Sequence, residues 1–128
     1  MSITRSRIAI GFATPADVNA ADLVLELSRQ STAGITGRIS LREKFIAGDL
    51  TAELVEQQDL QARALAAQNA AQARLAAAQK ALDYLSNRRT WAGDVSNLEI
   101  SEAQLTVANL QVDLEIAKAE LAALQAVP

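Results

Sequence analysis

The sequence predicts an all-α protein: a long antiparallel helical hairpin of the coiled-coil type, preceded by a short N-terminal helical head. Three observations lead to this prediction. Apolar residues recur every 3.5 residues near the C-terminus, the middle of the chain is rich in alanine and glutamine, and glycines separate these segments. We therefore divide the chain into an N-terminal arm and head (residues 1–48) and a hairpin (residues 49–128) with its turn near residues 90–95.

An unbroken heptad pattern occupies residues 100–124. The apolar residues step by three and four positions, and we call these eight residues the seam: Ile100, Ala103, Val107, Leu110, Leu114, Ala117, Leu121 and Leu124. A 3.5-residue period keeps one stripe against a neighbouring helix. A strand is the competing interpretation, because apolar residues also alternate from Leu110 to Ile116. The longer heptad pattern and the flanking helix formers favour the helix.

A second apolar stripe runs along the same segment. It comprises Leu98, Leu105, Val112 and Ala119, joined by Ile116 and Ala123. A helix that is apolar on two sides needs neighbours on both sides. We therefore predict that the interface residues of this protein come from both stripes: Ile100, Val107, Leu110, Val112, Leu114, Leu121 and Leu124.

The N-terminal part begins with a short arm, residues 1–13, which we expect to dock on a neighbour. Its alternating Ile8, Ile10 and Phe12 leave open a β-strand added to the sheet of a partner. A helix then begins at Thr14 and Pro15, a capping residue followed by a proline at the first helical position. We expect this helix to end at about residue 29 or 30.

A loop is predicted at Ser31–Gly37, because two glycines and three hydroxyl residues occupy this segment. Ser40 and Glu43 resemble a capping box, which favours a short helix through residue 46. Gly48 either stops that helix or lies inside a longer one.

The pattern is helical from Asp49 to about Arg89. Residues 62–81 contain 11 alanines, and leucine mixes with glutamine at heptad spacing, at Leu54, Gln58, Gln61, Leu65, Gln68, Gln72, Leu75, Gln79 and Leu82. Either the glutamines are buried and pair with one another, or they face water and the alanines make the contact. Both interpretations stay open.

The break at residues 90–95 contains Trp91 and Gly93, and Ser96 or Asp94 can cap the next helix, expected over 96–127. A Trp-x-Gly triplet between two helices resembles the Trp-x-Gly family of small secreted helical hairpins, which are often dimeric. That family is typically shorter, and its C-terminal tyrosine-based secretion signal is missing here. Apart from the resemblance, Trp91 is expected to fill the open end of the hairpin.

Composition argues against an enzyme. The chain has no cysteine and no histidine, which removes thiol chemistry, the commonest metal ligand and the commonest general base. The carboxylate pairs Glu99–Glu102 and Asp113–Glu115 are interpreted as a solvated acidic face, and Arg88–Arg89 as cations suited to a helix C-terminus. We expect no catalytic, cofactor or metal site and no small-molecule substrate.

Charge and hydropathy bear on the partners. Residues 90–128 hold one Lys/Arg against six Asp/Glu, which argues against nucleic acid as the partner of this segment. Since no run of 18 apolar residues and no signal-peptide core is present, we predict no membrane partner and leave the localisation open. The partners expected are copies of the chain itself and other protein subunits.

These observations favour a non-enzymatic structural protein, a helical subunit of a homo-oligomer or larger particle. A phage virion component, associated with capsid, neck or tail, is the specific hypothesis, which rests on analogy of composition. The alternative is a helical binding module, such as a secreted Trp-x-Gly hairpin, a chaperone or an adaptor.

Overall fold

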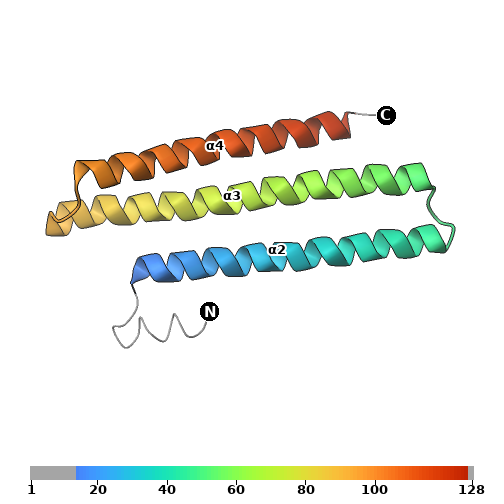
Figure 1. Cartoon of the computed structure of the whole chain (residues 1–128), viewed down its shortest axis with the longest axis horizontal. Helices are drawn as coiled ribbons and strands as arrows, with labels where there is room; N and C mark the ends of the chain where they lie inside the picture. The colour runs from blue at the N-terminus through green and yellow to red at the C-terminus, as the bar shows by residue number, and fades with distance from the viewer. Residues whose placement is uncertain (1–13, 127–128) are drawn as a thin grey trace.

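The computed structural model describes residues 14–126, so the predictions for the arm at residues 1–13 lie outside the described residues. The described part contains three helices and no strand, which confirms the all-α class. These are α2 (Pro15–Ile46), α3 (Ala52–Ala92) and α4 (Asn97–Gln125), each antiparallel to the helix before it (Figure 1). α3 packs against both α2 and α4, whereas α2 and α4 do not pack against each other. The helices therefore form one flat layer with α3 in the middle.

α2 begins as the sequence predicts. The Thr14 hydroxyl accepts the N–H of Asp17 at 3.2 Å, and the Asp17 carboxylate accepts the N–H of Thr14 at 3.0 Å. The N–H groups of Thr14 and Asp17, which have no partner within the helix, are thereby satisfied. Pro15 follows at a position where the missing N–H costs nothing.

The predicted loop at Ser31–Gly37 is wrong, and so is the helix end expected near residue 30, because α2 continues without a break to Ile46. Glycine inside a helix costs about 1 kcal/mol relative to alanine, a cost that packing along α3 offsets. The hydroxyls of Thr32 and Thr36 each donate to a carbonyl oxygen four residues earlier at 3.0 Å, so they are satisfied within the helix. The start expected at Ser40 does not exist, since it lies inside α2.

Gly48 is where the first helix stops. Ala47 is the C-cap of α2, and Gly48 adopts the left-handed backbone conformation with φ of +80°. A glycine tolerates this conformation without steric cost. The next helix then begins at Thr51, whose hydroxyl accepts the N–H of Leu54 at 3.2 Å.

The predicted hairpin corresponds to α3 and α4, and the turn between them lies at residues 93–96. Gly93 turns the chain with φ of +66°, and its N–H donates to the carbonyl of Arg89 at 3.2 Å. Ser96 caps α4 by accepting the N–H of Glu99 at 3.1 Å. The turn is thus where the sequence places it, and of the two caps considered Ser96 is the one used.

Trp91 does not close the open end of the hairpin, which corrects the sequence expectation. It lies in the last turn of α3 with 88% of its surface exposed. Val95 is the buried residue of the turn, with only 8% exposed. The residue that the turn covers is therefore Val95, two positions beyond Gly93.

The core of the described part is thin. Only six residues are buried, and none is completely shielded from solvent: Ala71, Ala77, Val95, Leu114, Ala117 and Leu121. Three of the six are alanines, which bury little apolar area each. A single layer of helices also leaves two broad faces and two edges open, so most large side chains stay in contact with solvent.

Candidate interaction surfaces

The seam of α4 faces α3 along its whole length. All eight seam residues are buried or half-buried, and every other residue of α4 is exposed. Leu114, Ala117 and Leu121 form the tightest part, at 7–9% exposed. Six of the seven predicted interface residues therefore lie in a contact within the chain: Ile100, Val107, Leu110, Leu114, Leu121 and Leu124. The structure brings these six together on one face and separates Val112 from them.

The glutamines of α3 divide between the two interpretations that the sequence left open. Gln58, Gln61 and Gln68 are half-buried, whereas Gln72 and Gln79 are exposed. The amide of Gln61 donates to the carbonyl oxygen of Leu124 on α4 at 3.3 Å, so this glutamine bonds to backbone rather than to another glutamine. Alanine provides the closest packing of α3.

The second stripe of α4 is exposed. The four large side chains of this stripe are more than half exposed: Leu98 66%, Leu105 62%, Val112 57% and Ile116 52%. Seven-residue spacing places Leu98, Leu105 and Val112 in one row, about half a helical turn away from the seam. We call these four residues the α4 edge, because they point away from α3 on the outer side of the layer.

The charges beside the α4 edge have one sign. Five exposed carboxylates flank it, at Glu99, Glu102, Asp113, Glu115 and Glu120. The one lysine of α4, Lys118, lies 3.6 Å from Glu115 and neutralises part of this charge. A partner for this surface therefore needs apolar side chains together with positive charge.

α2 carries a comparable exposed row in its C-terminal half. Ile35, Ile39 and Ile46 are 56%, 52% and 82% exposed, and their spacings of four and seven residues place them on one face. We call these three residues the α2 edge; Ile35 also lines the groove between α2 and α3 that is described below. The sequence alone does not predict this row, because the predicted loop at Ser31–Gly37 interrupts the helix on which the three residues align.

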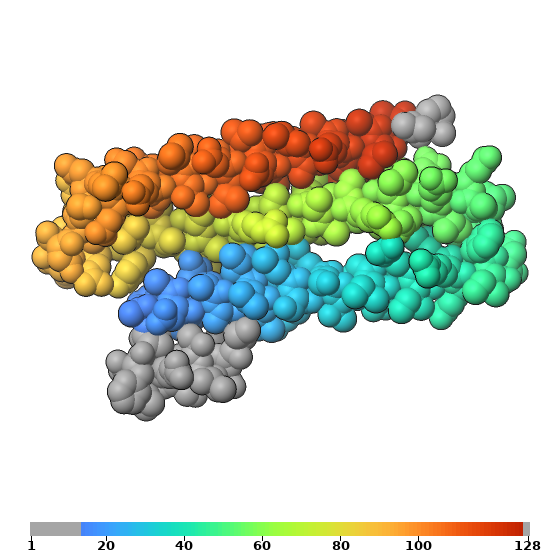
Figure 2. Space-filling model, viewed as in Figure 1, coloured from blue at the N-terminus to red at the C-terminus, as the bar shows by residue number. Residues whose placement is uncertain are grey.

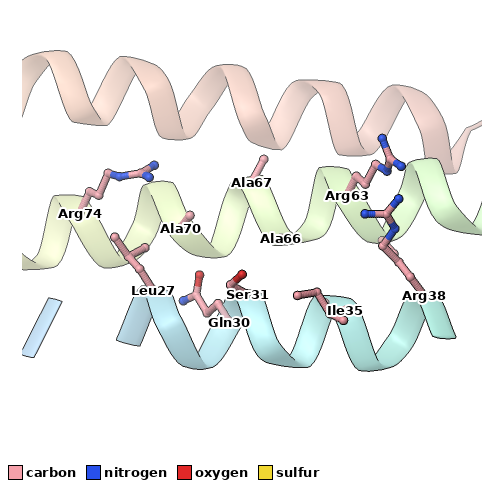
Figure 3. Close-up of a pocket in the computed structure, with 12 residues that line it drawn as sticks. Leu27, Gln30, Ser31, Ile35, Arg38, Arg63, Ala66, Ala67, Ala70 and Arg74 are labelled. Atoms are coloured by element: carbon pink, nitrogen blue, oxygen red, sulfur yellow. The ribbon is translucent and has the colours of Figure 1, made fainter. Parts of the chain in front are cut away.

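A groove of about 400 Å³ lies between α2 and α3 (Figure 2). It exists because small residues face each other there, including Gly34, Ala66 and Ala70, and leave space between the helices. Figure 3 shows Arg38 and Arg63 at one end of this groove and Arg74 at the other.

The charges of the groove are partly used within the chain. Arg38 and Arg63 both pair with Asp59, at 3.2 and 2.9 Å. The amide nitrogen of Gln30 donates to the carbonyl of Asn69 at 3.4 Å, whereas the side-chain oxygen of Gln30 is buried and has no hydrogen-bond partner among the described residues. These contacts fasten α2 to α3 and do not assemble a nucleophile with a base.

Arg88, one of the two arginines noted in the sequence, pairs with Asp94 across the turn. Its guanidinium donates to the Asp94 carboxylate, with Nη2 to Oδ2 at 2.6 Å and Nε to Oδ1 at 3.0 Å, and also donates to the Tyr84 hydroxyl at 3.1 Å. The hydrogen bond from Arg88 lowers the pKa of Asp94, and the same contact raises the pKa of Arg88. This pair fixes the turn between α3 and α4.

Neither a metal site nor a membrane span is found in residues 14–126. No three or more Asp, Glu, His or Cys side chains gather there in a way that could hold a metal ion. In the same part of the chain, no helix combines the length and hydropathy needed to cross a membrane. Comparison with protein-family models, with curated proteins and with solved structures finds no match for this chain.

Proposed function

We propose that this protein is a non-enzymatic structural subunit that assembles with copies of itself through helix packing. The observation that supports this proposal is the α4 edge, four large apolar side chains, each more than half exposed, on one 29-residue helix. Because part of each side chain is already covered, burying the rest stabilises an assembly by about 1–2 kcal/mol per residue. Exposed apolar surface of this kind is typical of association sites.

The thin core supports the same conclusion. A layer with six buried residues gains little from its own packing, so contacts with other chains add stability that the single chain lacks. At 1.5 Å per residue α4 is about 44 Å long, and a helix is about 10 Å wide. One helix edge therefore buries on the order of 400 Å² on each partner, or about 800 Å² in total, which is the size of a weak interface. We expect assembly that depends on protein concentration.

The experiment that tests this function is light scattering coupled to size exclusion over a range of concentrations. A defined oligomer is the expected result for the wild-type chain. Val112→Ser should lower the oligomer mass while the helical circular dichroism stays largely unchanged, because Val112 is 57% exposed and lies outside the seam that packs on α3. Leu114→Ser, two residues away on the seam, is the matched control and should lower both the oligomer mass and the helical circular dichroism.

A monomer at every concentration would contradict this function and favour the helical binding module instead. An unchanged oligomer in Val112→Ser would place the interface elsewhere on the molecule. The virion component is the specific form of the proposal, and it predicts that the protein is found by mass spectrometry in purified particles.

A further inference from the structure

The flat layer has two open edges that are not alike. The α4 edge lies on one outer helix and the α2 edge on the other, with α3 between them (Figure 1). Each edge presents apolar side chains that are at least half exposed. In an assembly, each edge can therefore be covered by an edge of another copy.

Charge distinguishes the candidates. The α4 edge is flanked by five carboxylates, and residues 29–46 of α2 carry four cations against one carboxylate. Arg38 is already paired with Asp59 of α3, which leaves Arg29, Arg42 and Lys44 against Glu43. Two α4 edges facing each other would oppose acidic groups, and two α2 edges would oppose basic ones. Like charges placed across an interface disfavour it, whereas opposite charges select it. An α4 edge facing an α2 edge is the one combination that matches both charge and apolar surface.

We propose that the α4 edge of one copy packs on the α2 edge of the next copy, so that the three-helix layers join side by side. This inference rests on the proposed function and specifies its geometry. The contact uses two different surfaces, so it is heterologous, and each copy keeps one free edge for a further copy. Repetition of such a contact produces a closed ring or an open filament.

Complementary variants test this arrangement. One chain carries Leu105→Ser and Val112→Ser on the α4 edge, and the other carries Ile39→Ser and Ile46→Ser on the α2 edge. Each variant alone should weaken self-association about a hundredfold, because each truncated anchor counts about tenfold. Each still has one intact edge, and the two intact edges are complementary. An equimolar mixture should therefore form a dimer of twice the 13.6 kDa chain mass and stop there.

Leu65→Ser on α3 is the matched control, because Leu65 is 47% exposed but lies on neither edge. It should keep the wild-type mass. The arrangement is overturned if the α2-edge variant keeps the wild-type mass, if the mixture forms no dimer, or if Leu65→Ser disrupts the assembly as strongly. A wild-type chain that is monomeric throughout would instead refute the proposed function itself.

Charge reversal gives a second, independent test if the serine variants lose helicity. Glu102→Arg, Asp113→Arg and Glu120→Arg together reverse the sign of the charge beside the α4 edge, and Arg29→Glu with Arg42→Glu reverses that of residues 29–46 of α2. Each reversal alone should lower the oligomer mass, whereas the chain that carries all five substitutions should recover it, since the two surfaces again carry opposite charge. In a symmetric contact between two α4 edges, the α2 reversal would change nothing, and that result would overturn the proposal.

Discussion

The two interhelical contacts of the layer differ in kind. Between α3 and α4, a continuous apolar seam buries Leu114, Ala117 and Leu121. Between α2 and α3, no residue of α2 is buried, grooves remain, and polar contacts recur, such as Asn19 Nδ2 to the carbonyl oxygen of Ala77 at 2.8 Å. An uninterrupted heptad pattern excludes water, whereas glycines and hydroxyl residues leave gaps that polar groups bridge. Stability should therefore concentrate in the α3–α4 hairpin.

The largest effect is expected when one leucine from each contact is replaced by alanine. Leu114→Ala removes a side chain that is 7% exposed and should lower the free energy of unfolding by about 3 kcal/mol. Leu27→Ala removes a half-buried side chain that lines the groove and should lower it by about 1 kcal/mol. Urea unfolding at one protein concentration measures both. Equal losses would mean that the two contacts are packed alike.

A second comparison concerns the turn between α3 and α4. Val95→Ala removes two buried carbons and should cost about 1.5 kcal/mol, whereas Trp91→Ala should change stability by less than about 0.5 kcal/mol, as exposed substitutions do. The fluorescence of Trp91 should show the emission of a solvated indole, since 88% of the residue is exposed. Blue-shifted emission that returns to the solvated value in the monomeric α4-edge variant would place Trp91 in an assembly contact.

Replacing a glycine in the looser contact, between α2 and α3, should stabilise the protein. A Cβ added at Gly34 meets no atom within 4 Å, so Gly34→Ala should raise the free energy of unfolding by about 1 kcal/mol through helix propensity. Gly93→Ala is the control of opposite sign, because φ of +66° strains any residue with a Cβ and should cost about 1 kcal/mol. A destabilised Gly34→Ala variant would show that the groove needs the glycine.

The smallest effect is expected from the exposed Arg88–Asp94 pair. Because Arg88 lowers the pKa of Asp94 in the folded state, the pair adds stability at pH values above the ordinary pKa of 3.8. That contribution is lost as pH falls below 3.8 and the folded carboxylate takes up its proton. Thermal unfolding at pH 7 should show a slightly lower midpoint for Asp94→Asn than for wild type, and the difference should shrink as the pH is lowered below 3.8. A difference that persists in acid would point to a role other than charge pairing.

Much of the fold could be predicted because local signals agree with it. The Thr14 cap and the turn at Gly93 were predicted, and the stop at Gly48 and the cap at Ser96 were each one of two alternatives; all four depend on backbone groups within a few residues. The prediction of a loop at Ser31–Gly37 was wrong because packing against α3 outweighs the low helix propensity of the glycines. The prediction for Trp91 was wrong because the way α3 and α4 pack together decides which residue near the turn is covered.

The sequence by itself determined the helical character of the two hairpin segments, the seam of α4 and the absence of cysteine and histidine chemistry, since periodicity and composition are read directly from the chain. Only the tertiary structure decided what lies against what. α3 in the middle assigns the seam to a contact within the chain and leaves Val112 outside. The continuation of α2 to Ile46 creates a second edge. Two apolar stripes on one helix look equivalent in sequence, and the positions of the neighbouring helices alone distinguish them.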